Sequence, residues 1–318
     1  MFIIILRIMK LSTYLHDGRQ SFGVVSDGGI CDIPSHWRAG PRSVLELIQA
    51  GPEAMKKLSG LTGKAKKLLP PSEVRLLAPI PDPPKVIGLA VNYVEHHREF
   101  GRAQDMPEDP KRRTTPRPFI MPQTAVTGPN TEIPWPAYSR QIDYEIELAV
   151  VIGRPCKCVS PQQAKEFIFG YTIANDVSAR SVTHSEGRTP RPKDDFFDWL
   201  HGKWADCFCP IGPYVVTADE VGDPRNLDLE LTVNGEVRQK ANTRQMIHDV
   251  YETVSFLSHL MTLLPGDVIA TGTPSGVGMA TGRLLKGGDV ITCRIQKIGE
   301  LTNMLGEPPS DFYAPCRP

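Results

Sequence analysis

Three acidic side chains occupy alternate positions of one otherwise apolar segment, DYEIEL, at residues 143–148. In a β-strand, side chains two residues apart project from the same face, so Glu145 and Glu147 are predicted to lie together, with Asp143 beside them. Neighbouring buried carboxylates repel each other and are costly to remove from water. A divalent cation relieves both problems, and oxygen ligands suit Mg²⁺ or Mn²⁺. The alternative interpretation is a solvated strand face.

A third carboxylate candidate is Asp176, within the segment YTIANDVSAR at residues 171–180. Asp176 follows an apolar strand at the point where the chain turns, so it is placed to join Glu145 and Glu147 at one cation. On local sequence alone, a helix N-cap or an Asx-turn explains the same residue.

His96 and Glu99 are three residues apart in a segment with helical spacing, NYVEHHREFG. Residues at this spacing share one helical face and can form a hydrogen bond. A carboxylate that holds an imidazole makes a general base able to take a proton from water. The alternative is a charged surface helix beside a loop.

Two further pieces offer positive charge and hydrogen-bond donors. Lys203, between Gly202 and Trp204, is a candidate for stabilising a developing oxyanion. The segment TGTPSGVG at 271–278 offers backbone N–H groups and hydroxyls for a carboxylate. It lacks the Gly-Lys-Ser/Thr ending of a phosphate loop and the glycine spacing of a dinucleotide fingerprint.

The elements that must position these side chains begin with a small N-terminal region. Residues 9–84 alternate polar and apolar positions around Asp-Gly turns and include a short helix that ends at Gly51. They predict a small α/β domain. A proline-rich junction near residue 84 precedes the main body, residues 85–306, and a tail of residues 307–318 follows.

In the main body, strands are more frequent than helices. The segment 141–153 predicts one long strand, Asn234-Gly235 predicts a hairpin, and the apolar spacing over 246–261 predicts an amphipathic helix. Two polar stretches, 102–118 and 181–204, predict surface loops. The fold class is therefore predicted to be α+β and rich in β-structure.

The bulk composition favours a folded protein that acts on a small molecule. Of 318 residues, 40% are hydrophobic and 23% charged, and 36 basic residues balance 36 acidic ones. This balance draws the chain neither to nucleic acid nor to an anionic membrane. The apolar start is interrupted by Arg7, too early for a membrane span of about 20 residues, and lacks a secretory cleavage pattern. We expect a cytoplasmic protein whose natural start is Met9.

Seven cysteines are present, an odd number without the spacing of a disulfide framework. Two Cys-x-Cys pairs occur, at 156/158 and at 207/209. Structural zinc sites favour longer spacing and a second pair of ligands, so reduced thiols are the preferred interpretation.

Six segments, in order along the chain, resemble the fumarylacetoacetate hydrolase superfamily. They are GLAVNYVEHHREF, DYEIELAVVIGR, GYTIANDVSAR, GKWADCFCPIGPYVVT, LTVNGEVRQ and PGDVIATGTPSGVG, which lie between Lys85 and Gly306. The resemblance is closest to the acylpyruvate hydrolase and oxaloacetate decarboxylase members. It implies a distorted β-roll with a metal site at its mouth, a short lid helix and a homodimer.

The same resemblance assigns roles to residues. Mg²⁺ or Mn²⁺ would be held by Glu145, Glu147 and Asp176. The catalytic residues would be His96, Glu99 and Lys203, and the substrate contacts Thr273, Gly272 and Arg180. Two positions depart from many relatives, because Thr183 stands in place of a glutamine and Met121 in place of a lysine. Both positions face substrate in those relatives, so the identity of the substrate does not carry over.

These residues predict a metal-dependent hydrolase that cleaves a C–C bond in a 2,4-dioxo acid of the acylpyruvate or fumarylpyruvate type. The metal would act as a Lewis acid on the keto acid, while His96, supported by Glu99, activates water. One alternative is an oxaloacetate decarboxylase, which needs no water attack. Others are an isomerase or hydratase of unsaturated dicarboxylic acids, or a non-catalytic binding protein.

Overall fold

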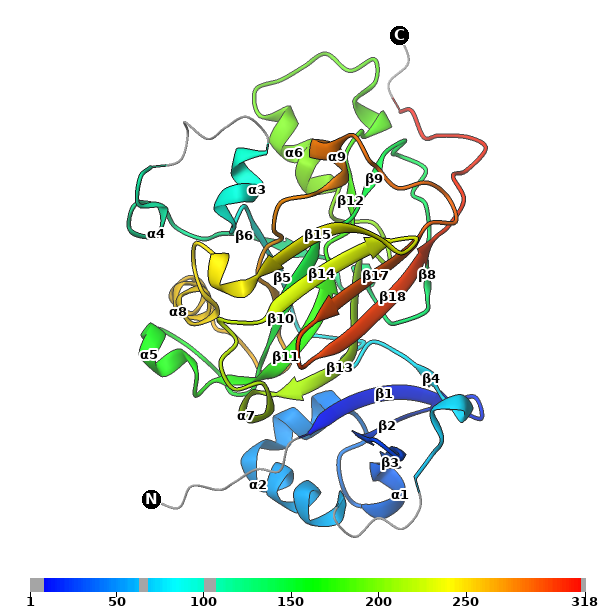
Figure 1. Cartoon of the computed structure of the whole chain (residues 1–318), viewed down its shortest axis with the longest axis vertical. Coiled ribbons are helices and arrows are strands. Elements are labelled where there is room, and N and C mark those ends of the chain that lie inside the picture. The colour runs from blue at the N-terminus through cyan, green and yellow to red at the C-terminus, as the bar shows by residue number, and fades with distance from the viewer. Residues whose placement is uncertain (1–8, 63–67, 100–106, 316–318) are drawn as a thin grey trace.

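The computed structural model describes residues 9–62, 68–99 and 107–315. Strands dominate it, so the predicted β-rich α+β class is confirmed. The N-terminal elements lie at one end (Figure 1), and α3 (Val94–Arg98), α6 (Asp194–His201) and α9 (Gly278–Thr281) lie toward the other. Residues 1–8, which bear on the choice between Met1 and Met9, lie outside the described residues, as does part of the predicted 102–118 loop.

The N-terminal part forms a meander whose first strand joins the central sheet. Its elements are β1 (Lys10–His16), β2 (Arg19–Ser26), β3 (Gly29–Asp32), α1 (Ile33–His36), α2 (Val44–Thr62), η1 (Pro71–Glu73) and β4 (Arg75–Leu76). The β1–β2 turn uses positive φ at Asp17 (49°) and Gly18 (72°), as an Asp-Gly pair predicts. Because β1 pairs antiparallel with β13 (Cys209–Thr217), this part extends the central sheet. The domain division near residue 84 stays a prediction.

The helix predicted to end at Gly51 does so, but a second helix follows directly. Gly51 has φ 76° and ψ −165°, a conformation that breaks α2 into two helices. Pro52 then begins the second helix, because proline is tolerated in the first turn, where its missing N–H has no helical partner. The prediction that the helix ends at Gly51 therefore did not include the second half of α2.

The central sheet has the strand order β3-β2-β1-β13-β11-β10-β16-β5-β6. Its remaining strands are β11 (Ile168–Asn175), β10 (Ile146–Ile152), β16 (Val268–Ala270), β5 (Val86–Ala90) and β6 (Arg117–Met121). The short β4 pairs with β1, and β7 (Val126–Thr127) pairs with β13. One face of this sheet packs on the N-terminal helices, which explains why β10 is buried along its whole length.

A second sheet has the order β15-β14-β17-β18-β8. Its strands are β15 (Glu236–Asn242), β14 (Asp228–Val233), β17 (Val290–Ile295), β18 (Gly299–Leu305) and β8 (Glu132–Ile133). The predicted hairpin at Asn234-Gly235 is confirmed, with positive φ at both residues (51° and 82°). Apolar residues of both sheets pack together in one large core.

The long strand predicted over 141–153 is interrupted, so this prediction is wrong in part. Residues Ile142–Asp143 form β9, which pairs with β12 (Ser178–Ala179), whereas β10 begins only at Ile146. At Glu145 the backbone N–H donates to the side chain of Asn175 instead of a strand neighbour (2.9 Å). Because of this break, Asp143 belongs to a different strand from Glu147, and the predicted alternation of side chains does not extend to it.

The remaining helical elements are short. They are α4 (Pro110–Arg113), η3 (Gln123–Ala125), α5 (Pro161–Ala164), η4 (Thr183–Ser185), α7 (Ala218–Val221), η5 (Thr243–Gln245) and α8 (Val250–Leu260). The amphipathic helix predicted over 246–261 corresponds to α8, whose start is capped by Asp249. Among the described residues, none of the helices combines the length and apolar character that crossing a membrane demands.

Candidate active site

The three carboxylates predicted to bind metal converge at the end of the β10–β11 pair. Glu147 lies in β10, Glu145 directly before it, and Asp176 directly after β11, where its N–H donates to the Glu145 carbonyl (2.9 Å). One ligand oxygen from each lies within 4.8 Å of the others. The exposed fractions are 5% for Glu145, 0% for Glu147 and 1% for Asp176. A solvated strand face does not describe these residues.

Two buried cations accompany the carboxylates. Lys203 Nζ lies 2.9 Å from Glu145 Oε2 and 2.7 Å from Asp176 Oδ2. Arg180 pairs with the other oxygen of Glu145, and its Nε donates to Asp143 Oδ2 (2.9 Å). The two cations stabilise Glu145 and part of Asp176, whereas Glu147 has no basic partner among these pairs.

Asp143 does not join the carboxylate cluster. Besides Arg180, it accepts the backbone N–H groups of Gly278 (2.6 Å) and Met279 (2.9 Å). It therefore ties the start of α9 to the guanidinium that touches Glu145. The sequence analysis missed this role, because it depends on contacts between segments more than 130 residues apart.

The charges in the cluster move the pKa values in different directions. Burial would raise the pKa of Glu145, but the charges of Lys203 and Arg180 outweigh it and hold this pKa at about 2. Burial, with the charges of Asp176 and Glu145, raises the pKa of Glu147 well above its usual range. Burial, opposed by Lys203 and reinforced by Glu145, raises the pKa of Asp176 to about 6. The ionised forms of Glu147 and Asp176 are therefore disfavoured in the metal-free site, and a bound cation would favour them.

Two oxygens of the cluster lack any partner. Glu147 Oε1 and Asp176 Oδ1 are buried without a hydrogen bond, although buried carboxylate oxygens are normally satisfied. The other oxygen of Glu147 accepts the N–H of Gly272 (2.6 Å). The donor set is made of oxygens only, which suits a hard dication such as Mg²⁺ or Mn²⁺. The unpartnered oxygens, and carboxyl groups whose ionised forms lack compensation, both fit such an ion.

The predicted histidine–glutamate pair is present, with His96 on α3 and Glu99 directly after this helix. His96 Nδ1 and Glu99 Oε1 are 2.6 Å apart, and His96 is buried. The second oxygen of Glu99 accepts the N–H of Gly276 (2.7 Å), which joins the helix to the 271–278 loop. The charge of His96 also contributes to the lowered pKa of Glu145, so the pair lies near the carboxylates. A charged surface helix does not account for these contacts.

The 271–278 loop connects the two parts of the site. Gly272 N–H binds Glu147, the Thr273 hydroxyl donates to the Ile146 carbonyl (2.9 Å), and Gly276 N–H binds Glu99. Gly272 has φ 92°, and a Cβ there would lie 2.7 Å from the Cβ of Asn92, so glycine is required. The polar groups of Gly272, Thr273 and Arg180 are thus used within the protein, and their substrate contacts stay predictions.

Asn92 is a further site residue that the sequence analysis missed. Its amide donates to the carbonyls of His248 (2.9 Å) and Thr271 (2.8 Å), and its oxygen accepts the N–H of His248 (2.9 Å). It follows Val91, a β-branched residue with φ 56°, which is a costly conformation. Asn92 fixes the turn that leads into α3. The sequence signal that could have indicated Asn92 is its position shortly after the apolar strand β5 (Val86–Ala90).

At the two positions that depart from many relatives, Thr183 and Met121, the side chain contacts other parts of this chain. The Thr183 hydroxyl donates to the carbonyl of Tyr313 in the C-terminal tail (2.6 Å). Met121 is buried in β6. Two residues earlier in β6, the Phe119 ring meets the Trp199 ring edge-on, with ring centres 5.0 Å apart. Lys203 Nζ lies 5.8 Å from the centre of the Phe119 ring and 5.9 Å from the centre of the Trp199 ring. An aromatic wall thus borders the lysine.

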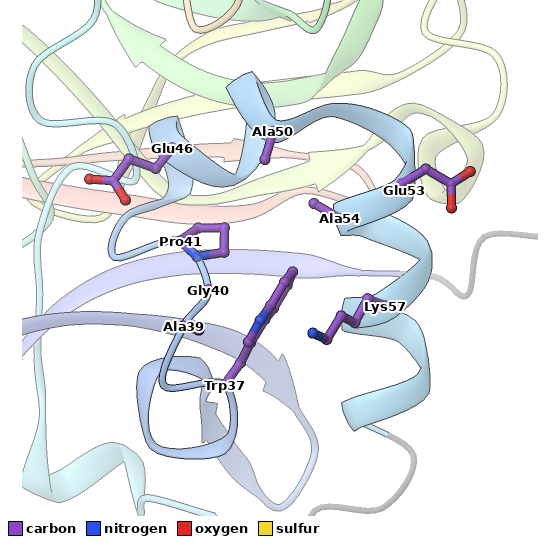
Figure 2. Close-up of a pocket in the computed structure, with 9 residues that line it drawn as sticks. All are labelled: Trp37, Ala39, Gly40, Pro41, Glu46, Ala50, Glu53, Ala54 and Lys57. Atoms are coloured by element: carbon purple, nitrogen blue, oxygen red, sulfur yellow. The ribbon is translucent and has the colours of Figure 1, made fainter.

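A surface hollow in the N-terminal part is unrelated to this site. Figure 2 shows its lining residues, among them the Trp37 ring and residues of the broken helix α2. The volume of the hollow is about 480 Å³. Lys57 Nζ lies 4.4 Å from the centre of the Trp37 ring and covers one face of it. None of its lining residues belongs to the carboxylate cluster or to the His96–Glu99 pair.

Comparison with known proteins assigns the fold and the family. The profile described as fumarylacetoacetate (FAA) hydrolase C-terminal matches residues 85–305. Oxaloacetate tautomerase FAHD2A, a mitochondrial protein of Bos taurus, is 38% identical over 278 residues, which cover 87% of this chain and 83% of the relative. The solved fumarylacetoacetate hydrolase of Exiguobacterium antarcticum is 35% identical with a TM-score of 0.77, covering 94% of this chain and 99% of that one.

A further relative was solved with ligands. The maleylpyruvate hydrolase of Sphingobium sp. SYK-6, in complex with manganese(II) and pyruvate, is 31% identical with a TM-score of 0.72. The alignment covers 95% of this chain and 100% of that one. Its fold matches over nearly the whole length, including the N-terminal part. By sequence and by structure, the chain belongs to the fumarylacetoacetate hydrolase family.

Proposed function

We propose that this chain is a Mg²⁺- or Mn²⁺-dependent enzyme that transfers a proton beside the keto group of a small 2-oxo diacid. Keto–enol tautomerisation of oxaloacetate is the activity we place first. The observation that carries the proposal is the buried cluster of Glu145, Glu147 and Asp176, with two unpartnered oxygens near a His–Glu pair. The similarity to an oxaloacetate tautomerase along 87% of the chain supports the choice of substrate.

In this proposal Glu145, Glu147 and Asp176 would hold the ion, which would supply Lewis-acid charge to the keto acid. His96 takes the proton from the carbon next to the keto group. The electrons of that C–H bond form the C=C bond of the enol, and the proton is delivered to the keto oxygen. Because Glu99 holds Nδ1, the other ring nitrogen, Nε2, is the one that exchanges the proton.

Lys203 supplies fixed positive charge in this scheme. Burial would lower the pKa of Lys203, but the charges of Asp176 and Glu145 outweigh it and raise this pKa. The ammonium group therefore stays protonated at neutral pH and can stabilise negative charge that develops on the substrate. The nearby aromatic rings of Phe119 and Trp199 limit the water around it.

The second candidate is hydrolysis of a C–C bond in a 2,4-dioxo acid. Glu99 fixes His96 and is itself fixed by Gly276, an arrangement that suits activation of a water molecule. The 31% identity to a maleylpyruvate hydrolase solved with pyruvate also supports this candidate. Both reactions use the same carboxylates, and they differ in whether His96 acts on carbon or on water.

One assay series separates the candidates. The purified chain is given Mg²⁺ and either enol oxaloacetate or an acylpyruvate, while ultraviolet absorbance reports the enol and released pyruvate is measured enzymatically. We expect fast loss of the enol signal without pyruvate release, and loss of this activity in Glu145→Gln but not in the exposed control Glu53→Gln. Faster acylpyruvate cleavage than tautomerisation would favour the hydrolase, and pyruvate from oxaloacetate would indicate a decarboxylase. Full activity after exhaustive chelation would contradict all three.

We further propose a homodimer, as the family resemblance implies. Light scattering on the purified chain tests it, with twice the 35.2 kDa chain mass expected. A mass of one chain at micromolar concentration would contradict it.

A further inference from the structure

A second cluster of metal-ligating side chains lies on the 181–204 segment. His184, Asp198 and His201 offer ligand atoms that all lie within 4.8 Å of one another, and none belongs to the carboxylate cluster. His184 lies in η4, whereas Asp198 and His201 are three residues apart on α6 and share one face of that helix. The three side chains thus bring two separate elements to one point.

Neither imidazole is committed to a strong hydrogen bond within the cluster. His184 Nε2 is a buried atom that lies 3.3 Å from Asp198 Oδ1 but lacks the geometry of a hydrogen bond to it. The His201 ring packs on the rings of His184 (centroids 5.4 Å apart) and Trp204 (5.2 Å).

The carboxylate of the cluster is held in place by an arginine. Arg188 donates to both oxygens of Asp198 (3.0 and 2.8 Å), and its Nε lies 3.2 Å from Asp194. Such outer contacts orient a ligating carboxylate, and each oxygen keeps a second lone pair for an ion. The guanidinium charge opposes a cation, while Asp194 offsets that charge. Affinity must therefore come mainly from the two imidazole nitrogens.

We propose that His184, Asp198 and His201 form a second cation site, which takes a borderline transition-metal ion of the Zn²⁺ or Co²⁺ class. Two imidazoles and one carboxylate match the donors that such ions prefer, and they leave a coordination position for water. The oxygen-only cluster of Glu145, Glu147 and Asp176 suits Mg²⁺ or Mn²⁺ instead, so the two sites would bind different classes of ion.

The second site has a structural consequence. An ion there would link η4 to α6, and α6 is followed by Gly202 and then Lys203. The ion would thus brace the segment that places Lys203 beside Glu145 and Asp176.

A Co²⁺ titration of the full chain tests the proposal. Excess Mg²⁺ occupies the oxygen cluster, and exposed thiols such as Cys158 are alkylated first, so that visible absorption bands report nitrogen ligation. We expect one equivalent of Co²⁺ to bind, and His184→Ala and His201→Ala each to weaken binding about tenfold or more. His16→Ala, in the N-terminal part, and Glu147→Gln, in the oxygen cluster, should leave the bands unchanged.

A second measurement on the unaltered chain guards against variants that fail to fold. Zn²⁺ is added to ¹⁵N-labelled protein in excess Mg²⁺, and the imidazole signals of His184 and His201 should shift together at one equivalent. Unmoved signals from these two histidines would overturn the proposal. Co²⁺ bands that persist in both well-folded histidine variants would overturn it as well.

Discussion

Replacing Glu147 by glutamine should stabilise the metal-free chain while it removes activity, which is the reverse of what a buried polar substitution normally does. Glu147 is fully buried, one of its oxygens has no partner, and the charges of Asp176 and Glu145 raise its pKa in addition to burial. Glu147→Gln removes the charge and keeps nearly the same shape. Its amide oxygen can still accept the Gly272 N–H, and its NH₂ group adds a hydrogen-bond donor where Glu147 Oε1 has no partner.

The expected magnitude follows from the spacing of the carboxylates. Their oxygens lie within 4.8 Å of one another, and at an effective dielectric of about 20 two unit charges at that distance repel by about 3.5 kcal/mol. Glu147 has two such neighbours, and its attraction to Lys203 offsets one of them. At neutral pH the metal-free chain bears either this repulsion or the similar cost of keeping the Glu147 carboxyl group protonated. We therefore expect the variant to gain about 3 kcal/mol in its free energy of unfolding at neutral pH.

Urea unfolding of the chain and the variant, each with chelator and with excess Mg²⁺, measures both effects. The unaltered chain should be stabilised by Mg²⁺, whereas Glu147→Gln should start more stable and respond little to the ion. The exposed substitution Glu53→Gln serves as the matched control and should change neither value by more than about 0.5 kcal/mol. A metal-free Glu147→Gln chain less stable than the unaltered one, or one with full Mg²⁺ stabilisation, would refute the reasoning.

Three further outcomes are expected. Glu145, with its pKa lowered from 4.5 to about 2, gives its full stabilisation above about pH 4.5. Asp176, with its pKa raised from 3.8 to about 6, destabilises the folded chain as it ionises, and Glu147, whose pKa is also raised, acts in the same direction. The metal-free chain should therefore lose at least about 2 kcal/mol between about pH 4.5 and about pH 6, which urea unfolding in chelator checks. Asn92→Ala should cost about 2–4 kcal/mol in the same assay, because it removes three buried hydrogen bonds. His96→Gln should lower kcat by about a hundredfold or more while the Mg²⁺-induced rise in Tm stays, as kinetics and thermal melts would show.

Local sequence patterns could predict the parts of the site that depend on short spacing. Glu145 and Glu147 follow from the alternation of a strand, and the His96–Glu99 contact follows from helical spacing. Asp176 could not be assigned this way, since a turn explains it equally well. Its convergence with the glutamates is a consequence of β10–β11 pairing, and only the family resemblance indicated it.

The parts that the sequence could not predict depend on long-range contacts. Arg180 binds Glu145 and Asp143, which lie 35 and 37 residues away, and Asn92 binds backbone groups 156 and 179 residues away. No local pattern encodes such partners. The break between β9 and β10 has the same origin, because the side chain of Asn175 replaces a strand neighbour at Glu145.

The central claim is that three distant carboxylates hold one hard cation even though Lys203 and Arg180 contact two of them. Anomalous X-ray scattering from a crystal of the chain grown with Mn²⁺ and pyruvate tests this most directly. We predict one strong manganese peak in direct contact with Glu145, Glu147 and Asp176. A crystal that binds no manganese there, with Lys203 still bridging Glu145 and Asp176, would contradict the account.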